Sequence, residues 1–171
     1  MKTRVAFFFS ILAILFSDNI FADGEYFGVN LSQVRFQEPG IPEARPLALS
    51  ISAGKKINKN FAVEARVAKG VREDEINVFD TPVEVEINQS FGVYVLGIIP
   101  LDVFSVYGVI GYSDGKITAR TDEFSISDTD HSVSYGIGGD VFLGKNLSIN
   151  VEYTKYFDNV YALSSGLKVL F

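Results

Sequence analysis

The feature that most constrains this chain is a strict alternation of apolar and polar residues within short segments. In the segment 146–156, for example, Leu147, Ile149 and Val151 alternate with polar neighbours. Successive side chains of a β-strand point to opposite faces, so such a segment is a strand with one apolar face. The pattern recurs and predicts eight strands, at residues 26–34, 47–55, 61–69, 83–96, 103–113, 132–143, 146–156 and 161–171.

The connections between these segments alternate in length. Short turns that alternate with long loops are typical of membrane barrels, whose turns face the periplasm and whose loops face outward. An even number of strands then places both ends of the barrel chain on the periplasmic side. We predict long polar connections at 35–46, 70–82 and 114–131, and short ones at 56–60, 98–102, 144–145 and 157–160.

The N-terminus has the layout of a secretory signal peptide. A basic start precedes an apolar run of 12 residues, 5–16, which is shorter than the roughly 20 residues that a membrane-spanning helix needs. A membrane anchor that stays attached is therefore the weaker alternative. We expect a signal peptide at 1–22, cleaved between Ala22 and Asp23, and a barrel domain at 23–171.

Composition excludes several functional classes. The chain carries a formal net charge of −6, and removal of the signal peptide leaves 13 basic and 20 acidic residues, a net charge of −7. Such acidity argues against a nucleic-acid partner, which would require a basic patch. The absence of cysteine excludes disulfides, thiol catalysis and lipid attachment to an N-terminal cysteine.

Alternation alone does not say which face points inward, because a soluble barrel such as a lipocalin also alternates. The polar faces here are rich in Gly, Ala and Ser, which suits the narrow interior of an eight-stranded barrel. Aromatic residues also lie near the ends of the apolar faces, as in the girdles of membrane barrels. The expected girdle comprises Phe27, Phe61 and Phe104 at the short-turn end and Tyr112, Tyr153 and Tyr161 at the loop end. We therefore predict an all-β fold, a monomeric eight-stranded antiparallel up-and-down transmembrane β-barrel in the bacterial outer membrane.

Seven charged residues fall on the faces that should point into the barrel. An isolated buried charge costs several kcal/mol, so we expect these residues to pair, with Arg66 and Lys168 as counter-ions of the carboxylates. The result would be a plug, since eight strands leave no open aqueous channel. A narrow channel for small solutes is the alternative. The expected lumen charge network is Glu64, Arg66, Glu84, Glu86, Asp140, Glu152 and Lys168.

Other motifs give no catalytic, cofactor or metal site. The stretch 128–131 holds two aspartates and the single histidine of the chain, without a recognised ligand spacing, and is interpreted as a solvated acidic loop. His131 and Ser132 would point to opposite faces of a strand, so a lipid-modifying hydrolase lacks its required geometry. We predict that the protein is not an enzyme and has no cofactor.

The glycine-rich stretch 136–139 does not match a dinucleotide-binding motif, because it lies in an alternating segment with no helix after it. Glycines within strands more often mark close packing. We expect these glycines to make room for inward-pointing Tyr94 and Tyr107.

The segment YALSSGLKVLF (161–171) resembles the C-terminal strand of bacterial outer-membrane barrels, which ends in Phe after apolar residues at alternate positions. Here these are Leu167, Val169 and Phe171. The stretches 134–157 and 106–112 are similar to opacity-type porins and to the membrane domain of outer-membrane protein A. The resemblance implies recognition of this ending by the barrel-assembly machinery.

That family is functionally diverse, so the resemblance indicates the fold more than the activity. We expect outer-membrane lipid as the surroundings of the barrel. The leading hypothesis is a structural or adhesion-like role, in which the long loops contact host or envelope surface components. A narrow porin-like channel is the alternative, and an envelope lipid-modifying enzyme is the third.

Overall fold

The computed structural model describes residues 24–37, 42–78, 81–120 and 125–171. The expected signal peptide and its cleavage site at Ala22 and Asp23 lie outside these residues. The described chain is almost entirely β-strand, and no helix in it is long and apolar enough to cross a membrane. Its strands are β1 (Glu25–Phe36), β2 (Leu47–Asn58), β3 (Phe61–Arg72), β4 (Asp74–Val78), β5 (Thr81–Pro100), β6 (Phe104–Arg120), β7 (Ser125–Phe142), β8 (Leu147–Phe157) and β9 (Val160–Leu170).

The strands form one closed, antiparallel barrel. Each strand pairs with its neighbour in sequence except that β3 pairs with β5 instead of β4, and β1 pairs with β9 to close the barrel. Only Glu73 separates β3 from β4, and both of these strands pair with β5, so they act as a single bent barrel strand. The prediction of eight barrel strands is thereby confirmed. Within the closed part of the barrel, every strand is paired on both sides, as a membrane requires.

The apolar faces of the strands point away from the barrel axis. In β1, the side chains of Phe27, Val29 and Leu31 are between 46% and 49% exposed. Their neighbours Asn30 and Ser32 are buried. A soluble barrel would show the reverse arrangement, so the choice of the apolar faces as the outer faces is confirmed. Continuous apolar exposure of this kind is stable in lipid and not in water.

Two of the expected long loops are mostly paired strands. The β6–β7 hairpin continues from Phe104↔Val141 to Arg120↔Ser125, although β7 pairs with β8 only as far as Tyr135. The first part of β5 likewise pairs with β4 and with the end of β6. The prediction of loops at 70–82 and 114–131 was wrong, because a ribbon with water on both faces needs no apolar face to keep its backbone paired.

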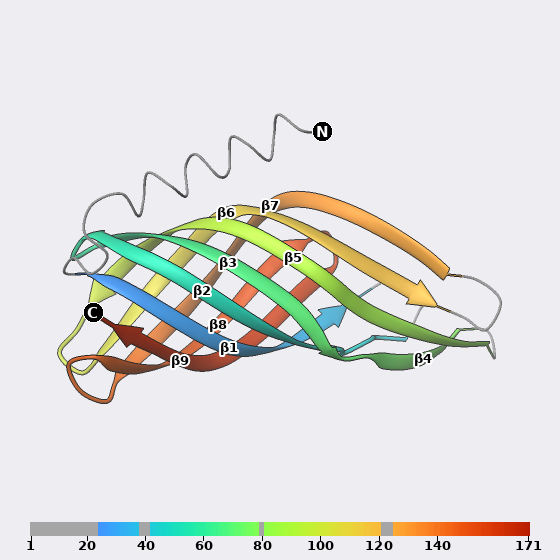
Figure 1. The fold of residues 1–171 in the computed structure, drawn as a ribbon, viewed down its shortest axis with the longest axis horizontal. Helices are drawn as coiled ribbons and strands as arrows, with labels where there is room; N and C mark the ends of the chain where they lie inside the picture. The colour runs from blue at the N-terminus through green and yellow to red at the C-terminus, as the bar shows by residue number, and fades with distance from the viewer. Residues whose placement is uncertain (1–23, 38–41, 79–80, 121–124) are drawn as a thin grey trace.

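We call β4 and the outer parts of β5, β6 and β7 (residues 81–88, 114–120 and 125–131) the projecting sheet. Figure 1 shows these strands continuing past the ends of β1, β8 and β9 at the right of the view. We call this side of the barrel the long-hairpin end and the opposite side the short-turn end. The backbone amide of Phe171 donates to the carbonyl of Glu25 at 2.9 Å, so β1 begins beside the end of β9 at the short-turn end.

The connection between β1 and β2 is tied to its neighbours at the long-hairpin end. Phe36 forms a bridge with Ala44, and the amide of Gln37 donates to the carbonyl of Asn159 at 2.9 Å. The amide of Arg45 donates to Oδ2 of Asp74 at 2.6 Å. These bonds hold the described part of this connection against the β8–β9 turn and β4.

The buried core lies inside the barrel. Its apolar side chains form two clusters, one toward each end. The cluster of the short-turn half comprises Tyr26, Ala62, Tyr94, Leu96, Tyr107 and Val109, and that of the long-hairpin half comprises Val34, Ala48, Ile87, Phe157, Val160 and Ala162.

Candidate functional site

The middle of the lumen is occupied by an ion cluster centred on Arg66 of β3. Its guanidinium donates Nη1 and Nη2 to the two carboxylate oxygens of Glu152, at 2.5 and 2.8 Å, and its Nε pairs with Glu64. The side chains of Glu64 and Glu152 are 1% and 3% exposed. The guanidinium also lies 4.4 Å from the centroid of the Tyr94 ring. A two-pronged contact of this kind fixes geometry as well as charge.

The same two carboxylates accept further hydrogen bonds from hydroxyl groups. Tyr26 donates its hydroxyl to Oε2 of Glu64 at 2.7 Å. Tyr107 donates to Oε2 of Glu152 at 2.9 Å, and Thr154 donates to Oε1 at 2.6 Å. Buried carboxylates that are paired and bonded in this way avoid most of the penalty of desolvation.

A second ion pair lies nearer the short-turn end. Nζ of Lys168 is 3.0 Å from Oδ1 of Asp140. Asn150 donates to that same oxygen at 3.0 Å and to the hydroxyl of Tyr107 at 2.7 Å. Since Tyr107 also bonds Glu152, it connects the two ion groups into one network across the lumen.

The structure brings together five of the seven charged residues expected in the lumen. Glu84 and Glu86 are the exceptions, since Glu84 is exposed and the side chains of Val85 and Ile87 are the buried ones. A register shift between Ile87 and Gln89 in the β5–β6 pairing marks a β-bulge, which reverses the two faces of the strand. The five that meet are Glu64, Arg66, Asp140, Glu152 and Lys168.

The rings of the network fit because glycines stand beside them. A Cβ added at Gly138 would lie 2.5 Å from Cζ of Tyr107, as expected for the 136–139 stretch. The space for Tyr94 comes instead from Gly92 and Gly111, where an added Cβ would lie 2.6 Å from Cε2 and 2.4 Å from Cδ1 of its ring. The sequence signal for these contacts is a glycine on the same face as the tyrosine, either two residues away on its own strand or directly opposite on the neighbouring strand.

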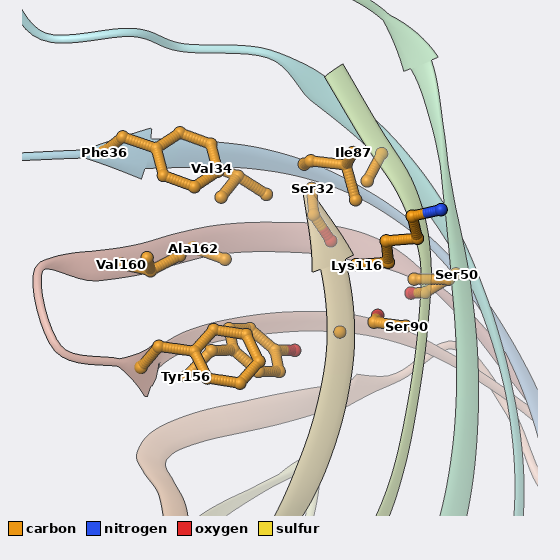
Figure 2. A pocket seen from close by; sticks show the side chains of 14 residues that line it. Ser32, Val34, Phe36, Ser50, Ile87, Ser90, Lys116, Tyr156, Val160 and Ala162 are labelled. Carbon is orange, nitrogen blue, oxygen red and sulfur yellow. The ribbon is translucent and has the colours of Figure 1, made fainter. Parts of the chain in front are cut away.

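The long-hairpin half of the lumen is lined mainly by apolar side chains instead of ion pairs, and the sequence did not predict this lining. An apolar pocket lies there, lined by side chains that include Val34, Ile87, Val160 and Ala162, and Figure 2 shows them around a hollow. A register shift between Lys155 and Phe157 in the β8–β9 pairing brings the ring of Phe157 into the lumen, where it is 7% exposed. The pocket therefore depends on two bulges that the alternation pattern does not reveal.

The residues expected at the membrane boundaries lie on the outer surface. Tyr153 and Tyr161 stack with their ring centroids 6.1 Å apart, and Tyr161 is half-buried. The other members of the expected girdle are 42–52% exposed, namely Phe27, Phe61, Phe104 and Tyr112. The expected assembly residues Leu167, Val169 and Phe171 are 41–50% exposed.

The remaining motifs are described only in part. His131 lies with its ring centroid 6.2 Å from that of Tyr112, on the outer face, and Ser132 donates to the carbonyl of Val133. No group of three or more His, Cys, Asp or Glu side chains in the described ranges could hold a metal ion. The side chains of residues 125–130 lie outside the description.

The sequence matches the family of outer membrane protein β-barrel domains over residues 7–164. The chain belongs to this family. Membership places the protein in the bacterial outer membrane, as the lipid-facing apolar surface requires, and confirms the resemblance to small outer-membrane β-barrels. No curated protein matches the sequence closely enough to count as a relative.

Solved structures of outer-membrane proteins share the fold of this barrel. Ail, the attachment invasion locus protein of Yersinia pestis, is 19% identical with a TM-score of 0.62, over 86% of this chain and 97% of Ail. Neisserial surface protein A is 19% identical with a TM-score of 0.60, over 87% and 98%. The N-terminal barrel domain of OprF from Pseudomonas aeruginosa is 10% identical with a TM-score of 0.59, over 87% and 98%. These outer-membrane β-barrels differ enough in sequence that the likeness concerns the fold alone.

Proposed function

We propose that this outer-membrane β-barrel is a sealed anchor that presents its projecting sheet to macromolecular partners outside the cell. The observation that carries the proposal is the length of the β6–β7 hairpin, whose pairing continues to Arg120↔Ser125 after β8 has ended its pairing at Tyr135↔Lys155. A rigid, paired ribbon that stands above its neighbours offers a surface for binding that a flexible loop would have to order first.

The lumen supports an anchor more than a channel. Arg66 and Glu152 join β3 to β8 across the barrel, and Lys168 joins β9 to Asp140 of β7. An eight-stranded barrel has an interior that side chains alone can fill. Small solutes would have to break these buried ion pairs in order to pass.

The charge of the projecting sheet limits the kind of partner. Its residues, 74–78, 81–88, 114–120 and 125–131, contain seven acidic and two basic residues, a formal net charge of −5. Ail has been crystallised in complex with the heparin analogue sucrose octasulfate, but a sheet with this charge would repel such a polyanion. We therefore propose partners with a neutral or basic surface.

The test compares the full chain with a variant whose β6–β7 hairpin is shortened. Residues 118–127 are replaced by Asn-Gly, a dipeptide that favours tight hairpin turns, and both proteins are placed in phospholipid nanodiscs. Binding to immobilised polylysine and to immobilised heparin is then measured at several salt concentrations. We expect binding of the full chain to polylysine that weakens with salt and falls in the variant, without heparin binding. Equal binding by both proteins would contradict the role of the sheet.

A separate measurement addresses the sealed lumen. Purified full-length protein in a planar bilayer should give no steady conductance steps, because the ion network fills the barrel. Steady single-channel conductance would replace the anchor with the channel hypothesis.

A further inference from the structure

The turns at the short-turn end of the barrel differ in polarity from one side to the other. The β5–β6 and β7–β8 turns carry Leu101, Val103 and Leu143, which are 45%, 65% and 57% exposed. We call these three side chains the apolar turn tips. The β2–β3 turn at the same end is basic, because residues 55–60 contain three lysines, two asparagines and a single apolar residue, Ile57. Exposed apolar side chains gathered on one side of the barrel end indicate contact with another surface.

The apolar turn tips belong to one surface, because the two turns are bonded to each other. The amide of Phe142 donates to the carbonyl of Val103 at 2.9 Å, which ties the β7–β8 turn to the start of β6. The amide of Leu143 donates to the carbonyl of Leu147 at 2.9 Å, which closes the β7–β8 turn. Figure 1 shows both turns together at the lower left of the view, away from the β2–β3 turn.

This surface continues the lipid-facing surface of the barrel. On β5 and β7, no charged side chain occupies the outward positions within residues 91–101 and 133–143, which end at the turns. On β1 and β2, by contrast, the outward pair Glu25 and Lys55 ends the apolar surface before the turn, with Nζ of Lys55 3.4 Å from Oε1 of Glu25. The apolar surface is therefore taller on the β5–β7 side, and there it includes the turns.

We propose that the apolar turn tips insert into the lipid leaflet at the short-turn end, so that lipid is the partner of this surface. Lipid fits better than a second barrel or a soluble protein, because no polar border separates the tips from the lipid-facing surface of β5 and β7. Asp102 and Lys145 lie in the same turns and are exposed. Their charges limit insertion to the boundary between acyl chains and headgroups, where a charged side chain still reaches water.

The strands that carry the tips also form most of the projecting sheet. β5, β6 and β7 end in the apolar turns on one side and continue into the projecting sheet on the other. Lipid that covers the tips draws these strands toward the long-hairpin end, whereas polar turns would let them sink toward the water at the short-turn end. The tips therefore set the height at which the projecting sheet stands above the membrane.

The first test measures how well water reaches the tips. The chain contains no cysteine, so Val103→Cys, Leu143→Cys and the control Lys59→Cys on the β2–β3 turn each carry one thiol. Full-length variants in phospholipid nanodiscs that hold one barrel react with a charged maleimide, and each rate is divided by that of the same variant unfolded in urea. We expect the tip thiols to react at least about tenfold more slowly than the control, because thiolates rarely form in apolar surroundings. Comparable rates would overturn the proposal.

A second measurement identifies what covers the tips. The chain contains no Trp, so Val103→Trp and the control Lys59→Trp each give a single fluorescent reporter in the same nanodiscs, which contain neither a second barrel nor a soluble protein. We expect Val103→Trp to emit further to the blue and to be quenched more by lipids with brominated acyl chains than by aqueous iodide, with the reverse for the control. Stronger quenching of both by iodide would refute lipid contact. Protection of the tip thiols that arises only at high protein-to-lipid ratios in vesicles would assign the surface to a second copy instead.

The height of the projecting sheet is tested at the opposite end of β6. Tyr112→Trp reports the depth of this strand, with and without Val103→Asp and Leu143→Asp. We expect the two aspartates to move the reporter deeper into the bilayer, seen as stronger quenching by lipids brominated near the ends of their acyl chains. An unchanged depth would show that the tips do not set the height. Val103→Ser with Leu143→Ser decides the matter if the aspartate variant does not fold, as judged by heat-dependent gel migration.

Discussion

Truncation of Arg66 to alanine tests whether the ion network stabilises the barrel. The substitution removes the charge partner of both Glu64 and Glu152, whose side chains are 1% and 3% exposed. Removal of one partner from a buried ion pair typically costs about 3–5 kcal/mol, since the other charge stays buried. Tyr26, Tyr107 and Thr154 continue to donate to the two carboxylates, so we expect a value within this range and not above it.

The assay is reversible unfolding by urea in the presence of lipid vesicles, followed by gel migration and circular dichroism. With a urea dependence of about 2 kcal/mol per molar, the expected loss moves the midpoint by roughly 2 M. Arg72→Ala is the matched control, because Arg72 lies on the same strand and is exposed. We expect the control to change the free energy of unfolding by less than about 0.5 kcal/mol.

A third variant separates lost charge balance from lost packing. Arg66→Met combined with Glu64→Gln and Glu152→Gln removes all three charges while most of the side-chain volume remains. Replacement of a whole buried ion group is often close to neutral, so we expect this variant to recover most of the stability lost in Arg66→Ala. If Arg66→Ala costs no more than Arg72→Ala, the network does not stabilise the barrel and our reasoning fails.

Three further predictions concern packing, the second ion pair and assembly. Gly166→Ala should lower the free energy of unfolding by about 1–3 kcal/mol, because the added Cβ would lie 2.0 Å from the carbonyl oxygen of Val29. Gly97→Ala meets open space and should be nearly neutral. Urea unfolding compares the two variants, and equal losses would contradict close packing at Gly166. Lys168→Met should cost about 1–3 kcal/mol in the same assay, since it leaves Asp140 with hydrogen-bond donors alone, and no measurable loss would show that this pair is dispensable. Phe171→Ala should lower the amount of folded barrel in the outer membrane several-fold in cells, measured as the heat-modifiable fraction on gels, while the stability of the inserted protein changes little because the ring is 50% exposed. An unchanged folded fraction would argue against a role of Phe171 in assembly.

Alternation predicts which side chains point into the lumen only where a strand keeps the same two faces along its whole length. In β8, the alternation from Leu147 to Thr154 assigns every face correctly. In β5, the same reasoning assigns Glu84 and Glu86 to the lumen, because a bulge after Ile87 leaves no mark in the alternation of apolar residues. The inward-facing residues were therefore predictable in the middle of the lumen, where the strand pairing is regular. They were not predictable at its long-hairpin end.

The sequence by itself determined that the chain forms a closed barrel with an apolar outer surface. Alternation with period two is a local property that each strand carries alone, and the small and charged residues on the other face could be stable only inside. Which residues meet was decided by the tertiary structure. Arg66 and Glu152 are separated by 86 positions, and only the register of all intervening strands places them opposite each other. The two bulges that build the apolar pocket are likewise a result of strand pairing, since a single inserted residue changes which face points inward without any change in composition.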